Sequence, residues 1–235
     1  MNSLDALLWY IVSLFKYTAE MLPCMGAALV FFLLFRPAQN RRRLEQQHLV
    51  SGPWREGALL MFFMFLAGLA ALTLFPAGFW RTVIRWVLRP EVRAGELDFS
   101  ALYPSWEETA RRLADWRNVL MPFQEIRRAL RHGSWLLFIQ LGNILMFLPV
   151  GFFVALLWRQ ARWWRSLLAG FAASVFIEFI QLFIGRVTDI DDVMLNTLGA
   201  LIGYGLFRLL RALFPRFTSK FQCHERKDTQ DGIFG

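Results

Sequence analysis

Five mostly apolar runs, each of about 20 residues, recur along this chain and constrain its fold more than any other feature. A run of that length crosses a bilayer as an α-helix, because lipid offers no water to satisfy other backbone polar groups. The composition agrees, with 56% hydrophobic residues and a mean hydropathy of +0.39. The sequence therefore predicts an all-α fold, a polytopic bundle of about five transmembrane helices in the cell membrane. We expect the spans at Ile11–Phe35, Ala58–Phe79, Trp135–Trp158, Ser166–Ile184 and Val193–Phe214.

The first span has the least defined start. Lys16 and Glu20 lie one helical turn apart, where their charges can neutralise each other, so the helix could begin nearer Leu4. No basic segment precedes it, which favours a retained helix over a cleaved signal peptide.

Positive charge is distributed unevenly between the loops. Cations cluster after the first span, after the third span and in the tail, whereas the N-terminus and the turn from Arg186 to Asp192 carry few. By the positive-inside rule we expect the N-terminus and that turn outside the cell and the C-terminus inside. The net charge of +8 then reflects topology and attraction to anionic lipid, and we expect no nucleic-acid partner. The loop Trp80–Ser134 must lie outside despite ten arginines, but its seven acids and its length weaken the rule there.

That loop shows two helical patterns. Arginines recur every fourth residue with apolar residues between them, which predicts an amphipathic helix in the membrane interface until Pro90 interrupts it. Ser105 and Glu108 form a capping box, and Glu107–Arg111 and Glu108–Arg112 are helix-supporting pairs, so a second helix from Trp106 to about Arg117 is expected. We divide the chain into an N-terminal two-span region with this loop (1–117), a three-span domain (118–214) and a basic cytoplasmic tail (215–235).

Ionisable and amide side chains concentrate within and between the last two spans. Such groups are costly at membrane depth, so their presence indicates a functional or architectural site. On the fourth span Ser174, Glu178 and Gln181 share one face, and on the fifth Asp192, Asn196, Gly199 and Gly203 do the same. The two faces can meet, and the two glycines permit close approach to another helix.

The third span is expected to join this face. Asn143 lies near its outer end, and Pro149 leaves the carbonyl of Leu145 without its helical donor. The sequence thus predicts a polar pocket that opens to the outside of the cell. Its expected ligand-binding residues are Asn143, Glu178, Gln181, Arg186, Asp189, Asp191, Asp192 and Asn196.

Three stretches, NVLMPFQEIRRAL, LGNILMFLPVGFF and EFIQLFIGRVTDIDDVMLNTLGALIGY, resemble the VanZ-like membrane proteins. The resemblance covers roughly residues 118–208, with several independent motifs in the family's order. It implies signature positions at Asn143, Phe147, Pro149, Gly151, Glu178, Gln181, Arg186, Asp189, Asp192 and Asn196. It also implies an association with antibiotic resistance, specifically to teicoplanin, but no defined reaction.

Three hypotheses remain open for the polar cluster. The residues could be architectural, with Asp189 or Asp191 capping the fifth span, Arg186 pairing with an aspartate, and the other polar groups joining helices. They could instead bind or remodel an envelope lipid or glycolipid, or a lipid-linked precursor, with Arg186 and loop arginines on a phosphate. Third, an enzyme could act on a lipid-linked phosphate at the outer leaflet, with Glu178, Asp189 or Asp192 as catalytic candidates.

The sequence offers little support for other chemistry. Aspartates could hold Mg²⁺, but they lack the spacing and the glycine of an EF-hand loop, and the scattered cysteines and histidines form no metal site. We therefore expect no cofactor and no metal. A transporter is disfavoured because five spans show no inverted repeat.

Overall fold

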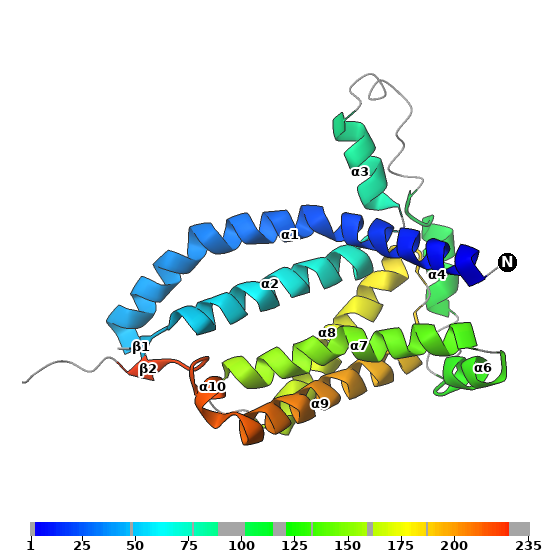
Figure 1. The fold of residues 1–235 in the computed structure, drawn as a ribbon. Helices are drawn as coiled ribbons and strands as arrows, with labels where there is room; N and C mark the ends of the chain where they lie inside the picture. The colour runs from blue at the N-terminus through cyan, green and yellow to red at the C-terminus, as the bar shows by residue number, and fades with distance from the viewer. Residues whose placement is uncertain are drawn as a thin grey trace, which may run out of the picture.

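The computed structural model describes residues 3–47, 49–76, 78–88, 102–114, 121–132, 134–158, 162–186 and 188–225. Among these residues, five helices are long and apolar enough to cross a membrane, as the sequence predicts. They run back and forth between two ends of the molecule, so α1 begins at the end opposite to the tail (Figure 1). The five are α1 (Ser3–Gln47), α2 (Pro53–Thr73), α7 (Ser134–Leu157), α8 (Trp163–Phe183) and α9 (Ile190–Leu213).

Helices α7, α8 and α9 begin and end within a few residues of the predicted spans. The first span is longer than predicted, because α1 continues to Gln47. The predicted end of the second span at Phe79 is wrong. Helix α2 stops at Thr73, since Pro76 disfavours helical geometry in the residue before it and Gly78 adopts a positive φ of 83°. Phe79 instead begins the next helix, α3 (Phe79–Leu88).

Short helices gather at the end of the bundle where α1 begins. Helix α3 runs across the direction of α1 in Figure 1, and it confirms the first predicted loop helix, whose stop at Pro90 falls outside the described residues. Helix α4 (Trp106–Ala114) confirms the second, although its predicted end at Arg117 also falls outside them. The capping box is formed: Glu108 N donates to Ser105 Oγ, and Ser105 N to Glu108 Oε2, both at 3.2 Å. A third helix, α6 (Gln124–His132), was not predicted.

The closest helix pair is α7 with α9, whose backbones touch at glycines. A Cβ atom built on Gly203 would lie 2.0 Å from the carbonyl oxygen of Leu148, and one on Gly199 would lie 2.3 Å from that of Ile144. On α7, a Cβ on Gly151 would lie 1.8 Å from the carbonyl oxygen of Ala200. The predicted close approach at Gly199 and Gly203 is confirmed, with α7 as the partner.

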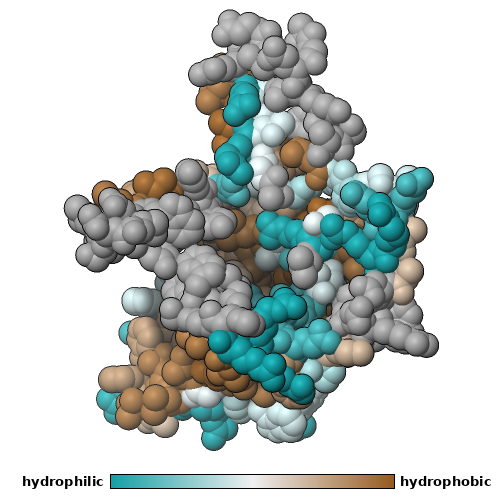
Figure 2. Space-filling view, turned by 90° about the vertical axis from the view of Figure 1, so that its right-hand side faces the viewer, coloured by the Kyte–Doolittle hydropathy of each residue, from teal (hydrophilic) through white to brown (hydrophobic). Residues whose placement is uncertain are grey.

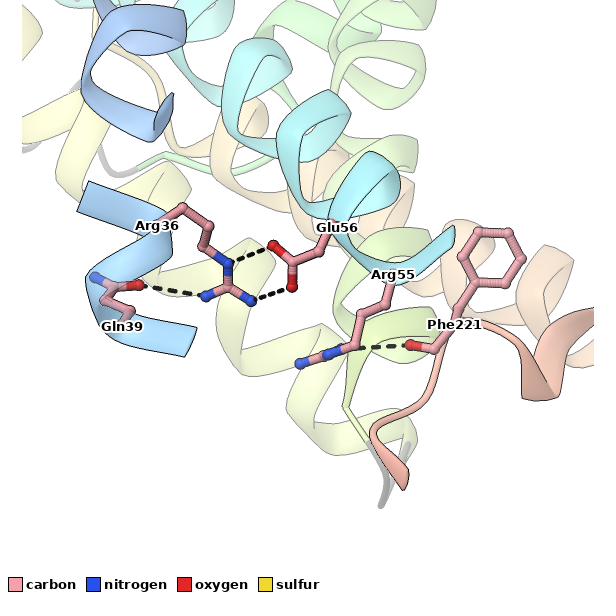
Figure 3. A network of polar contacts seen from close by, with 5 residues as sticks. All are labelled: Arg36, Gln39, Arg55, Glu56 and Phe221. Carbon is pink, nitrogen blue, oxygen red and sulfur yellow. Dashed lines mark hydrogen bonds and ion pairs between the residues drawn. The ribbon is translucent and has the colours of Figure 1, made fainter. Parts of the chain in front are cut away.

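Helix α1 packs very differently. Only 6% of the most apolar stretch of α1 is buried, and the helix contacts mainly α2. Among the described side chains, two ion pairs join it to other helices. The carboxylate of Glu20 forms an ion pair with Arg81 of α3 at 3.2 Å. The sequence had suggested Lys16 as its partner, and the side chain of Lys16 lies outside the described part of the structure. Arg36 forms two hydrogen bonds to Glu56 of α2, at 2.7 and 2.8 Å (Figure 3).

At the other end of the bundle, the chain after α9 folds back onto the α1–α2 turn. Helix α10 (Pro215–Ser219) follows α9 directly. Strand β1 (Leu49–Val50) pairs antiparallel with β2 (His224–Glu225), with Leu49 opposite Glu225. This contact joins the N-terminal pair of spans to the end of the three-span unit.

Candidate functional site

A polar cavity of about 350 Å³ lies where α2, α7, α8 and α9 meet at the end that carries α4 and α6. Figure 2 looks onto this end, where hydrophilic side chains gather towards the middle and apolar ones lie at the flank. We call the cavity the polar chamber. Six of the eight predicted ligand-binding residues line it: Asn143, Glu178, Gln181, Arg186, Asp192 and Asn196. Its apolar wall is formed by Met146, Phe147 and Ile177.

The polar faces of α8 and α9 meet as predicted. Ser174, Glu178 and Gln181 are all buried on α8, and Asn196 is buried on α9. The amide Nδ2 of Asn196 donates to Ser174 Oγ at 2.8 Å. The Oδ1 atom of Asn196 is also buried, and among the residues that the structure describes it has no donor. The amide is therefore half satisfied, which leaves an acceptor beside the chamber.

The third span joins the chamber through one hydrogen bond. Asn143 Nδ2 on α7 donates to Asp192 Oδ1 on α9 at 2.5 Å. Because α7 and α9 touch through glycines just beyond this point, the amide and the carboxylate are brought into register by backbone packing. The predicted participation of Asn143 is thus seen as a direct contact with one of the catalytic candidates.

Helix α2 contributes a residue that the sequence did not indicate. Gln181 Nε2 donates to the carbonyl oxygen of Thr73 at 3.4 Å, and Thr73 lines the chamber. The hydroxyl of Thr73 itself donates to the carbonyl of Leu69, one turn earlier. A lone threonine in the last turn of an apolar span carries no sequence signal for a site.

The turn between α8 and α9 is built around Glu178 and Asp189. Asp189 N donates to Glu178 Oε2 at 3.1 Å, and Asp191 N donates to Asp189 Oδ1 at 3.0 Å. Asp189 therefore caps α9, as one of the two predicted caps. Burial raises the pKa of Asp189 above its usual value, and the nearby charges of Asp191 and Glu125 raise it too, while the hydrogen bond from Asp191 opposes them.

Asp191, which was also predicted to bind ligand, is not among the residues that line the chamber. Its carboxylate is fully buried and accepts three backbone N–H groups at the start of α6, from Phe123 at 2.5 Å, Glu125 at 2.9 Å and Ile126 at 3.2 Å. Phe123 has a positive φ of 65°, a strained conformation for a residue with a side chain. Asp191 thus anchors the start of α6 over the first turn of α9.

A second, apolar pocket of about 320 Å³ adjoins the chamber and shares Glu178 with it. We call it the lateral pocket. Its wall is formed by Val175, Phe179 and Leu182 of α8, Val193 of α9 and Leu113 of α4, and Asp189 lies at its polar end. Arg112 of α4 also lines it and donates to the carbonyl of Arg186 at 3.0 Å, a longer-range contact than its predicted pairing with Glu108. This bond holds α4 against the α8–α9 turn.

Neither pocket offers an obvious metal site. Among the described residues, no group of three histidine, cysteine or acidic side chains is arranged to hold a metal ion. The catalytic candidates divide between the two pockets, since Glu178 lines both, Asp192 lines the chamber and Asp189 lines the lateral pocket.

Comparison with known proteins gives one match. Residues 97–211 match the model of the VanZ/LLP1 family, a range that contains α4, α6, α7, α8 and both pockets' carboxyl groups. No curated protein and no solved structure matches the chain. The matched segment agrees with the motifs in the last three spans and with the all-α membrane architecture, so this part of the chain is VanZ-like.

Proposed function

We propose that this protein binds an envelope lipid or glycolipid, with the polar part in the polar chamber and an apolar chain in the lateral pocket. The observation that carries this proposal is the shared wall: Glu178 borders a polar cavity on one side and an apolar pocket on the other. An amphiphile has these two parts joined in one molecule. Polar residues that served only to join helices would require neither the polar cavity nor the apolar pocket.

The polar groups favour a headgroup rich in hydroxyl or amide groups. Asn143, Gln181 and Asn196 supply amides, Glu178 and Asp192 supply carboxyl groups, and Arg186 supplies a guanidinium group. Carboxylates and amide oxygens accept from hydroxyls, and a guanidinium donates to phosphate or to sugar oxygens. Lowered susceptibility to teicoplanin is a further part of the proposal, because such a protein could change the lipid-linked targets at the cell surface.

The first test separates binding from architecture. We expect Glu178→Gln to reduce lipid retention and any drug-resistance phenotype while the protein stays inserted, because the amide keeps the size but cannot ionise and has one acceptor oxygen fewer. Arg186→Ala should act in the same direction. Membrane abundance and melting temperature in detergent are measured beside lipid retention in native mass spectrometry. A fall in abundance that parallels the loss of retention would instead support the architectural hypothesis.

Orientation is a second part of the proposal. In our topology the chamber faces the outside of the cell, because the arginine-rich segments after the first and third spans and in the tail lie at the opposite end of the bundle. The long loop Trp80–Ser134 lies on the chamber's side despite its ten arginines. In a variant without Cys24 and Cys223, single cysteines at Ser3 and Thr188 should label from outside, and those at Asn40, Gln160 and Gln222 from the cytoplasm. Labelling of position 188 only from the cytoplasm would reverse the assignment.

A second candidate function is catalysis on a lipid-linked phosphate at the outer leaflet. It is favoured by two carboxyl groups, Glu178 and Asp192, in one cavity with Arg186. One could exchange a proton while the guanidinium holds the phosphate. Incubation of the purified protein with a polyprenyl phosphate or phospholipid, followed by mass spectrometry of both lipid and headgroup, distinguishes turnover from binding.

A further inference from the structure

A third pocket lies at the other end of the bundle, far from the polar chamber. It has a volume of about 500 Å³ and is enclosed by the start of α2 and the segment after α9. Trp54, Gly57, Ala58 and Met61 form the α2 side, and Phe217 and Phe221 form the other. We call it the tail pocket. It shares no lining residue with the chamber or the lateral pocket, so the inference below is independent of the proposed function.

The walls of the tail pocket are held by specific contacts. The buried Arg55 donates to the carbonyl oxygen of Leu157 at 2.8 Å and to that of Phe221 at 3.4 Å; Figure 3 shows the bond to Phe221. The ring of Trp54 packs edge-on against Phe217 and Phe221, with centroids 5.9 and 6.1 Å apart. The pocket is therefore formed by a fixed end of the bundle.

The rim of the pocket carries positive charge. Lys220 Nζ lies 5.4 Å from the centroid of the Trp54 ring, one of the residues that line this apolar pocket. Arg216 belongs to the same short helix as Phe217. The acid closest in sequence to this wall, Glu56, is paired with Arg36. An apolar pocket with a cationic rim is complementary to a ligand with an apolar chain and an anionic head.

We propose that the tail pocket binds an anionic phospholipid, with one acyl chain against Trp54, Gly57 and Met61 and the phosphate at Lys220. The position of Trp54 in the first turn of a span fits this depth, because tryptophan favours the boundary between hydrocarbon and headgroups. Arg216 adds long-range attraction to the same headgroup.

Gly57 offers a way to fill the pocket without disturbing its walls. A Cβ atom built on Gly57 meets nothing within 4 Å, because it points into open space. Gly57→Leu therefore places a side chain where the acyl chain is expected. Gly205 of α9 is also open, with nothing within 4 Å, and it does not line the pocket, so Gly205→Leu is the matched control.

The experiment measures thermal unfolding in a neutral detergent with added phosphatidylglycerol or phosphatidylcholine, together with bound lipid in native mass spectrometry. For the parent and Gly205→Leu, phosphatidylglycerol should raise the melting temperature more than phosphatidylcholine and give a one-to-one adduct. Gly57→Leu should lose the adduct and most of the added shift. Lys220→Gln should lose the preference between the two lipids, and Lys220→Arg should keep it.

Three results would overturn the proposal. The parent could respond equally to both lipids, or Gly57→Leu could respond like the parent. The parent could also be a dimer that Gly57→Leu converts to a monomer, in which case a second copy occupies the pocket. If Gly57→Leu fails to fold, the Lys220→Gln variant still tests the proposal, because Lys220 is exposed. An unchanged preference of this variant for phosphatidylglycerol would contradict the assigned position of the headgroup.

Discussion

The unit of α7, α8 and α9 and the first helix, α1, are both apolar enough to cross a membrane, yet they are stabilised in different ways. In the three-helix unit, glycines bring backbones into contact and polar side chains bond between helices. Helix α1 has a mostly exposed surface, and nothing lies within 4 Å of a Cβ built on its Gly26. Helices of similar hydropathy therefore differ in what surrounds them: α7, α8 and α9 are positioned by contacts with each other, whereas α1 presents most of its surface to lipid.

The difference has a consequence for where function can reside. A cavity with defined polar groups requires walls that hold their relative positions, and packed glycines provide them. The polar chamber accordingly lies against the three-helix unit, and none of the described side chains of α1 lines it. Helix α2 has features of both regions, because its Thr73 lines the chamber and its Glu56 forms an ion pair with α1.

The largest expected effect comes from glycines in the α7–α9 contact. Gly203→Ala puts a methyl group 2.0 Å from a backbone oxygen, which neither helix can avoid without separating. We expect a loss of about 2–4 kcal/mol in unfolding free energy, or failure to accumulate. Gly26→Ala is the matched control and should be neutral or gain up to about 1 kcal/mol from helix propensity. Thermal or denaturant unfolding in detergent measures both, and similar losses in the two variants would remove the contrast.

The contact between the two halves should be the next most sensitive. Arg55→Ala leaves the carbonyl oxygens of Leu157 and Phe221 without its guanidinium, and hydrogen bonds from charged groups contribute about 1.5–3 kcal/mol. We expect a loss of that size and earlier proteolytic cleavage within residues 215–225. Arg216→Ala, at an exposed position nearby, is the control. Equal cleavage of the two variants would mean that the tail is held by other contacts.

A smaller and local effect is expected at α6. Asp191→Ala removes the acceptor for three backbone N–H groups and the support for the strained Phe123. By analogy with helix caps, we expect the free energy of local opening to fall by about 1–2 kcal/mol. Hydrogen exchange over residues 124–132 should speed up while exchange in α9 stays slow. If both regions accelerate together, Asp191 stabilises the whole unit and α6 is no separate element.

The smallest effect concerns pH. The pKa of Asp189 is raised in the folded state, so folding favours its protonated form and stability falls as pH rises from the ordinary carboxyl pKa through the folded one. Asp189→Asn keeps a helix-capping side chain and removes this titration. The melting temperature of the variant should therefore decline less than that of the parent between about pH 4 and neutrality. Parallel curves for the two proteins would show that other groups cause the pH dependence.

Much of the architecture could be predicted because it follows from local rules. Hydropathy and length give the spans, and a Ser105–Glu108 box gives the start of α4. Helical spacing gives the shared face of Ser174, Glu178 and Gln181. The end of α2 was predicted too late because the apolar stretch continues past the helix. Pro76 and Gly78 terminate the helix within that stretch.

What could not be predicted depends on contacts between distant residues. Asp191 resembles the neighbouring aspartates in sequence, and only the position of α6 above α9 gives it a structural role. Thr73 lines the chamber without any motif around it, and the capping box of α4 does not indicate that Arg112 lines the lateral pocket. The existence of a polar cluster could therefore be predicted, but not its division into a chamber, a lateral pocket and an anchor for α6.

The spacing of the ion pairs at Glu20 and Arg36 of α1 can be compared with the thickness of a membrane. Glu20 and Arg36 enclose a stretch of fifteen residues without charge, and each is paired to a neighbouring helix, so neither can move far along the bilayer normal. At 1.5 Å per residue the two positions lie roughly 24 Å apart, less than the ~30 Å of a typical hydrocarbon core. The mismatch is relieved by local thinning of the bilayer or by snorkelling of the paired side chains. On this side of the bundle, a bilayer thinner than a typical one would match the spacing of the two pairs without either adjustment.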